Sequence, residues 1–118
     1  MDEITRITQE TVRRFNEAMN LHDVDAVMAL MTDDCNFENT QEPPDGTRYT
    51  GAVEVRAFWT KFLADSPKAR FTEEDLIAAG DRCVVCWRYD WGDGHVRGVD
   101  VMRVRDGKIS EKFSYVKG

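Results

Sequence analysis

Apolar residues recur every three or four positions in the N-terminal part of the chain, and this spacing predicts amphipathic helices. A first helix is expected over residues 4–19, and a second begins after Asp23, whose side chain suits an N-cap. Their apolar faces comprise Ile4, Ile7, Phe15, Ala18 and Met19, with Val12 beside them, and then Val24, Val27, Met28 and Met31. A short strand at 35–39 and a proline-containing turn at 42–46 follow, and Thr50 is expected to cap a third helix that ends near Ala64.

The second half of the chain changes to a period of two, which is typical of β-strands. We predict strands at residues 71–79, 82–91, 95–105 and 108–116, separated by the turn sequences Gly80-Asp81, Gly92-Asp93-Gly94 and Asp106-Gly107. One side of the second strand carries Cys83, Val85, Trp87, Tyr89 and Trp91. Helices followed by strands and tight turns predict a single α+β domain over residues 1–118, with an antiparallel sheet.

One carboxylate lies on the apolar face of a predicted strand. The even positions of residues 95–105 are Val96, Gly98, Asp100, Met102 and Val104, and the odd positions include Arg97, Arg103 and Arg105. Burial removes hydration from a carboxylate and favours its neutral form, so we expect Asp100 to donate a hydrogen bond or to shuttle a proton. The alternative is a structural role, in which Asp100 pairs with an arginine or caps a backbone group.

The composition of the chain limits the kinds of partner that it is expected to bind. The net charge of −6 argues against nucleic acid, which is bound through a basic face. No stretch reaches the roughly 20 apolar residues of a membrane span, and the acidic N-terminus does not resemble a secretory signal. Cys35, Cys83 and Cys86 are therefore expected to be reduced, buried thiols in the cytosol. The C-x-x-C pair lies in a strand whose positions three apart face opposite sides, so we expect no metal and no cofactor.

Five short segments, in this order, resemble the nuclear transport factor 2-like (NTF2-like) superfamily, and within it the SnoaL-like polyketide cyclases and ketosteroid isomerases. The segments are NLHDVDA at 20–26, TDDC at 32–35, GAVEVR at 51–56, GDR at 80–82 and RDGKI at 105–109. The resemblance covers nearly the whole chain. It implies a cone in which a curved sheet wraps around three helices and leaves a deep pocket, and a homodimer formed through the outer face of the sheet.

The resemblance also places candidate site residues. It implies that Asp100 matches the acid that ketosteroid isomerases use as an oxyanion donor. However, Phe15 stands where those enzymes have a tyrosine, Asn39 where they have an aspartate base, and Ser114 where the cyclases have a carboxylate. A phenyl ring donates no hydrogen bond and an amide does not abstract a proton from carbon, so standard steroid isomerisation is not expected. The catalytic candidates are Asp100 and Asn39, although Asn39 and Ser114 could also be purely structural.

The expected pocket is aromatic and rich in methionine, a lining that suits small apolar molecules, although aromatic strand faces are also common in ordinary cores. Its candidate lining residues are Phe15, Met19, Met28, Met31, Phe37, Trp59, Phe62, Trp87, Tyr89, Met102 and Ser114.

Three functions are consistent with this pattern. The first is an isomerase-, cyclase- or lyase-like enzyme that moves a proton on a small apolar, carbonyl-bearing or polycyclic metabolite. The others are a carrier that binds such a molecule unchanged and a dimerisation module. A buried carboxylate costs stability unless it is paired, which argues against the last.

Overall fold

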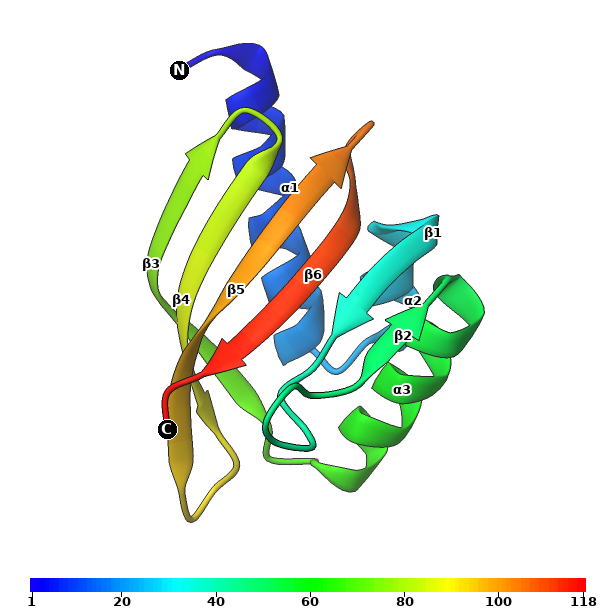
Figure 1. Ribbon diagram of the computed structural model, residues 1–118, viewed down its shortest axis with the longest axis vertical. Helices are drawn as coiled ribbons and strands as arrows, with labels where there is room; N and C mark the ends of the chain where they lie inside the picture. The colour runs from blue at the N-terminus through cyan, green and yellow to red at the C-terminus, as the bar shows by residue number, and fades with distance from the viewer.

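Three helices pack on the inner side of one curved six-stranded sheet in the computed structural model, which describes residues 1–118 (Figure 1). The helices are α1 (Glu3–Asn20), α2 (Val24–Ala29) and α3 (Ala52–Asp65). The strands are β1 (Met31–Glu38), β2 (Arg48–Thr50), β3 (Arg70–Ala79), β4 (Arg82–Asp90), β5 (His95–Arg105) and β6 (Lys108–Val116). The predicted α+β class and the helices-on-sheet cone are confirmed.

The strand order is β2-β1-β6-β5-β4-β3. The four C-terminal strands form an antiparallel meander, as predicted, and β5 and β6 have the predicted bounds. Strand β1 then pairs with β6 in parallel, so the sheet contains one parallel pair. Sequence periodicity identifies strands but not their neighbours, and this pairing was therefore not predicted. It extends the sheet by β1 and β2 on the side where α3 packs (Figure 1).

The predicted apolar face of α1 is wrong at its first turn, where Ile4 is 61% exposed. Instead, Thr5 and Thr8 are buried against the β3–β4 turn. Thr8 Oγ1 donates to the carbonyl of Gly80 at 2.7 Å, and the Gly80 N–H donates to Thr5 Oγ1 at 2.9 Å. These two bonds fix the rotation of the helix, so that Ile4 points to solvent while Val12 and Phe15 are fully buried.

The predicted N-cap of the third helix is also wrong. Thr50 is the last residue of β2 and pairs with Asn36 of β1, so its backbone is extended and the helix begins one residue later. Gly51 occupies the cap position with a φ of 88°, a conformation that glycine adopts without steric cost. The Thr50 N–H donates to Glu54 Oε2 at 2.8 Å, so a side chain within the helix satisfies the preceding backbone group.

Trp91 does not lie on the buried side of the sheet, as the alternation suggested, but is 39% exposed. Strand β4 ends at Asp90, and the Trp91 N–H donates to the Gly94 carbonyl in the turn before β5. This turn projects at one end of the sheet (Figure 1), where no helix covers it.

Candidate functional site

The predicted inward orientation of Asp100 is confirmed. The residue is 6% exposed and lies at the centre of β5, opposite Ser114 of β6. Its neighbours in the strand, Val99 and Val101, point to the outer face because successive side chains alternate. Asp100 therefore lies among the aromatic side chains on the concave side of the sheet.

Asp100 is not an isolated acid, because it pairs with Lys112, which was not predicted as a site residue. Lys112 Nζ lies 3.1 Å from Asp100 Oδ2, and each side chain is 8% exposed. Ser114 Oγ donates to Asp100 Oδ1 at 2.6 Å and accepts from Lys112 Nζ at 3.1 Å. The three side chains thus form a closed polar triad, and Asp100 is paired as the structural alternative required, but with Lys112 in place of an arginine.

The ammonium of Lys112 is held between this carboxylate and two aromatic rings. Nζ lies 4.9 Å from the ring centroid of Phe37 and 5.3 Å from that of Trp59, within cation–π range. Phe37 and Trp59 also stack on each other, with their centroids 4.8 Å apart. The sequence did contain a signal for this lysine, because Lys112 and Ser114 are two positions apart in one strand and must share a face.

A cavity of about 210 Å³ opens next to the triad, and Asp100, Lys112 and Ser114 form its polar end. Of the predicted lining residues, it contains Phe37, Trp59, Phe62, Trp87, Tyr89 and Ser114. Besides Lys112, five further residues line it that were not predicted as site residues: Phe58, Phe71, Val96, Thr40 and Gln41. The cavity is therefore largely aromatic, with one charged pair in its wall.

A second, smaller cavity of about 30 Å³ lies on the other side of the same residues. Trp59, Phe71, Trp87, Asp100 and Lys112 line both cavities and so separate them. Two predicted residues of α1, Phe15 and Met19, line only the smaller cavity. Its volume is enough for a water molecule, and Asn16 and Glu73 are among the polar residues that line it.

Three methionines predicted to line the pocket do not. Met28, Met31 and Met102 are buried in the hydrophobic core and reach neither cavity. Met31 pairs with Ile109 at the start of β6, away from the cavity. The side-chain alternation of β5 is correct for Met102, which lies opposite Lys112, but the core covers its side chain completely.

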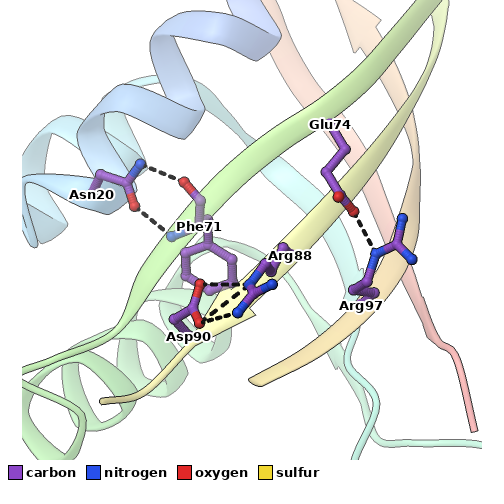
Figure 2. A network of polar contacts seen from close by, with 6 residues as sticks. All are labelled: Asn20, Phe71, Glu74, Arg88, Asp90 and Arg97. Carbon is purple, nitrogen blue, oxygen red and sulfur yellow. Dashed lines mark hydrogen bonds and ion pairs between the residues drawn. The ribbon is translucent and has the colours of Figure 1, made fainter. Parts of the chain in front are cut away.

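The aromatic wall of the larger cavity is anchored from α1. The side-chain amide of Asn20 donates to the Phe71 carbonyl and accepts from the Phe71 N–H, both at 2.7 Å (Figure 2). The side chain thereby takes the place of a neighbouring strand at the edge of the sheet. The Phe71 ring stacks on Tyr89 with centroids 4.8 Å apart, so the bonds from Asn20 position two lining residues.

Asn39 lies at the mouth of the larger cavity, but its side-chain oxygen is used by its own loop. Asn39 Oδ1 accepts from the N–H groups of Gln41 at 3.2 Å and Thr47 at 2.8 Å. The structural role that the sequence left open is therefore present. The amide nitrogen is the atom of Asn39 that is free to contact a ligand.

The indole N–H groups of Trp59 and Trp87 are buried without a hydrogen-bond partner. Buried donors are nearly always paired, so an unpaired donor beside a cavity indicates a water or ligand acceptor. Both tryptophans separate the two cavities. We therefore expect a water molecule or a ligand in one of the two cavities to accept hydrogen bonds from these indole N–H groups.

The cysteines do not form a ligand cluster, and no group of three or more His, Cys, Asp or Glu residues could hold a metal ion. Cys35 and Cys83 are buried, whereas Cys86 faces the outer side and is only half-buried. Burial, reinforced by the charge of Glu73, raises the pKa of the Cys83 thiol to about 11. Burial likewise raises the pKa of Cys35, so both thiols remain protonated and unreactive at neutral pH.

A curved, unclosed sheet wrapped around three helices is the architecture of the NTF2-like superfamily. The model of the SnoaL-like domain matches residues 12–112, and the chain belongs to this family. No curated protein matches the sequence.

Solved structures agree with this assignment. An NTF2-like protein of unknown function from Mesorhizobium loti is 43% identical, with 100% of this chain and 97% of that chain covered and a TM-score of 0.89. A protein provisionally named a ketosteroid isomerase, from Kribbella flavida, is 24% identical, with 97% and 80% covered and a TM-score of 0.84. A SnoaL-like protein of unknown function from Burkholderia thailandensis is 22% identical, with 99% and 100% covered and a TM-score of 0.81. The last two show similarity of fold alone.

None of the helices combines the length and the hydrophobicity that a membrane-spanning helix requires.

Proposed function

We propose that the protein binds a small apolar carbonyl compound in the larger cavity and moves a proton at the carbon next to the carbonyl group. The observation that carries this proposal is the buried pair of Lys112 and Asp100 in an otherwise aromatic wall. An ammonium and a carboxylate 3.1 Å apart provide a hydrogen-bond donor and a proton acceptor at one point of the cavity.

The two charges have complementary tasks in such a reaction. Lys112 donates a hydrogen bond to the carbonyl oxygen and stabilises the negative charge that develops there when a proton leaves the adjacent carbon. Asp100 accepts this proton and returns it, and Ser114 holds the carboxylate in position. Phe15 and Asn39 stand where the steroid isomerases have a tyrosine and an aspartate, and they provide neither the hydroxyl donor nor the carboxylate base. The proposed chemistry therefore depends on the lysine, and not on a tyrosine and a second aspartate.

The size of the cavity limits the ligand. An engineered protein cavity of about 150 Å³ holds benzene. The larger cavity has about 210 Å³, which suits a molecule of one or two rings and is too small to enclose a four-ring steroid. Most of the lining is apolar, so a ketone or aldehyde on an aromatic ring satisfies both the walls and the polar end.

The test uses 1-tetralone, a two-ring aromatic ketone, with the purified protein in D₂O. We expect a thermal shift on binding and faster loss of the proton NMR signal of the carbon next to the carbonyl. Asp100→Asn should still bind the ketone but lower the exchange rate by a factor on the order of 10² to 10⁴, because the amide accepts no proton from carbon. Asp93→Asn, in the exposed β4–β5 turn, is the matched control and should match the unchanged protein.

Two results would contradict this proposal, one its catalytic part and the other its ligand class. Binding without any exchange would favour a carrier that holds the molecule unchanged. If neither tetralone nor acetophenone raises the melting temperature, the cavity does not take this class of ligand.

We further propose that two copies associate through the outer face of the sheet, in the cytosol, where the three free cysteines would stay reduced. Val84, Val99 and Val101 lie half-buried along the middle of this face, and Ile77 and Tyr115 beside them are 60% and 53% exposed. Arg97, two residues before Val99 in β5, forms an ion pair with Glu74 of β3 at the border of this strip. Figure 2 shows the pair. An apolar centre with a polar rim is the usual composition of a protein interface.

Replacing Val101 with glutamate tests this association. A carboxylate in the middle of the apolar strip would be buried unpaired in a dimer but would remain hydrated in a monomer. We therefore expect the molar mass from light scattering to fall from twice the chain mass to the chain mass. Val53→Glu, at an 86% exposed position of α3, should leave the mass unchanged. A monomeric unchanged protein would refute the proposed dimer.

A further inference from the structure

Lys112 is the one lysine of this chain that is withdrawn from water. The other lysines, Lys61, Lys68, Lys108 and Lys117, are all exposed. Its Nζ contacts Asp100 and Ser114 and lies over the rings of Phe37 and Trp59. Its side chain also lines the ligand cavity, so a bound molecule can meet the amine directly.

Stability alone does not explain this arrangement. Replacing a buried ion pair by apolar side chains of similar volume is often neutral or stabilising, because the desolvation of both charges offsets their attraction. The surroundings of the pair are aromatic, and such a replacement would fit them. A lysine retained in an apolar ligand cavity is the setting in which this residue acts as a nucleophile toward carbonyl carbon.

We propose that Lys112 is a nucleophile that forms an iminium with an aromatic aldehyde or ketone bound in the larger cavity. This inference rests on the proposed function and makes it more specific, because the carbonyl group would be activated by a covalent bond as well as by a hydrogen bond. The nearest proton acceptor, Asp100 Oδ2, lies 3.1 Å from Nζ and can take the proton that the ammonium must lose before it reacts.

The step is balanced without any further reagent. The ammonium passes one proton to Asp100, and the free electron pair of Nζ then forms a bond to the carbonyl carbon. The proton on Asp100 and one from nitrogen are transferred to the former carbonyl oxygen, which leaves as water. The product iminium carries the same single positive charge as the original ammonium, so Asp100, ionised again once it has given up its proton, faces an oppositely charged partner as it did at the start. The adjacent carbon of the iminium releases its proton more readily than that of the free ketone.

The experiment traps the iminium by reduction. The full-length protein is incubated with a small excess of benzaldehyde and sodium cyanoborohydride, and the modified lysines are located and timed by peptide mass spectrometry. We expect Lys112 to be benzylated at least tenfold faster than any exposed lysine, because the cavity holds the aldehyde next to Nζ. Benzyl alcohol, which fills the cavity but forms no imine, should suppress this modification and leave that of the exposed lysines unchanged.

Variants separate the amine from its surroundings. Lys112→Arg keeps the positive charge but forms no iminium, so its peptide should carry no adduct while benzyl alcohol still raises the melting temperature. Lys108→Arg, at the exposed start of β6, is the matched control and should be modified at Lys112 like the unchanged protein. If Lys112→Arg folds poorly, the relative benzylation rates of Lys112 and the exposed lysines in the unchanged protein still test the proposal.

The outcomes distinguish the two proposals. If benzaldehyde or benzyl alcohol stabilises the protein but Lys112 reacts no faster than the exposed lysines, the nucleophilic role is refuted and the proposed function stands. If neither compound stabilises the protein and no selective adduct forms, both proposals fail. Selective benzylation of Lys112 that benzyl alcohol suppresses supports both.

Discussion

Replacing Lys112 with methionine is expected to lower the free energy of unfolding by about 3–5 kcal/mol. Methionine fills a similar volume, so packing changes little, but Asp100 is left buried in an apolar environment without its partner. Ser114 alone provides one neutral hydrogen bond to this carboxylate. The loss is large compared with the roughly 5–15 kcal/mol by which a domain is stable. Urea unfolding followed by circular dichroism measures it.

The double variant Asp100→Leu/Lys112→Met should recover most of this loss, because it removes both charges and leaves no uncompensated group. Lys108→Met, at an exposed position of the same strand, should change the free energy of unfolding by no more than about 0.5 kcal/mol. A Lys112→Met protein as stable as the unchanged chain would show that Asp100 is already neutral or reached by water. Recovery in the double variant would instead confirm that the charges are kept for a reason other than stability.

Of this pair, the sequence predicted Asp100 as a site residue but not Lys112. The reason lies in the residue pattern of strand β6. Its alternation places Ser110, Lys112 and Ser114 on one face, and Phe113 and Tyr115 on the other. Without the resemblance that placed Ser114 in the pocket, this pattern assigns the polar face to solvent and the aromatic face to the core. The observed orientation is the reverse, because the pairing with β5 sets Ser114 opposite Asp100. A polar strand face can be buried when its groups satisfy one another, and periodicity does not report such pairing.

Most elements of the fold were predictable because they depend on local spacing, but β2 was not predicted, and β1 begins at Met31, which was assigned to the second helix. The bounds of β5 and β6, with the tight turn between them, follow from alternation and from Asp106-Gly107. What could not be predicted depends on contacts between distant segments. The parallel pairing of β1 with β6 and the bonds of Asn20 to Phe71 are of this kind. The same limit explains the cavity, whose aromatic residues were mostly identified, whereas the position of each methionine along its element was not.

Replacing Trp59 with alanine should also have a large effect, for a different reason. Trp59 is 3% exposed, packs against the rings of Phe37 and Phe58, and lies under the Lys112 ammonium. Loss of a buried aromatic side chain of this size typically costs about 3–5 kcal/mol. Trp91→Ala, at the 39% exposed tip of the β4–β5 hairpin, is the matched control and should cost much less. Urea unfolding of both variants gives the comparison.

The same substitution should change which ligands bind. Trp59 lines both cavities and separates them, so its removal joins the two spaces into one. We expect benzophenone, a ketone with two separate rings, to raise the melting temperature of Trp59→Ala more than that of the unchanged protein, and acetophenone to show the opposite order. Trp59→Phe, which keeps a ring in the partition, should lie between them. Equal shifts for both ketones in every variant would contradict the assignment of Trp59 as the partition, because its side chain would then not limit the length of the ligand beside Lys112 and Asp100.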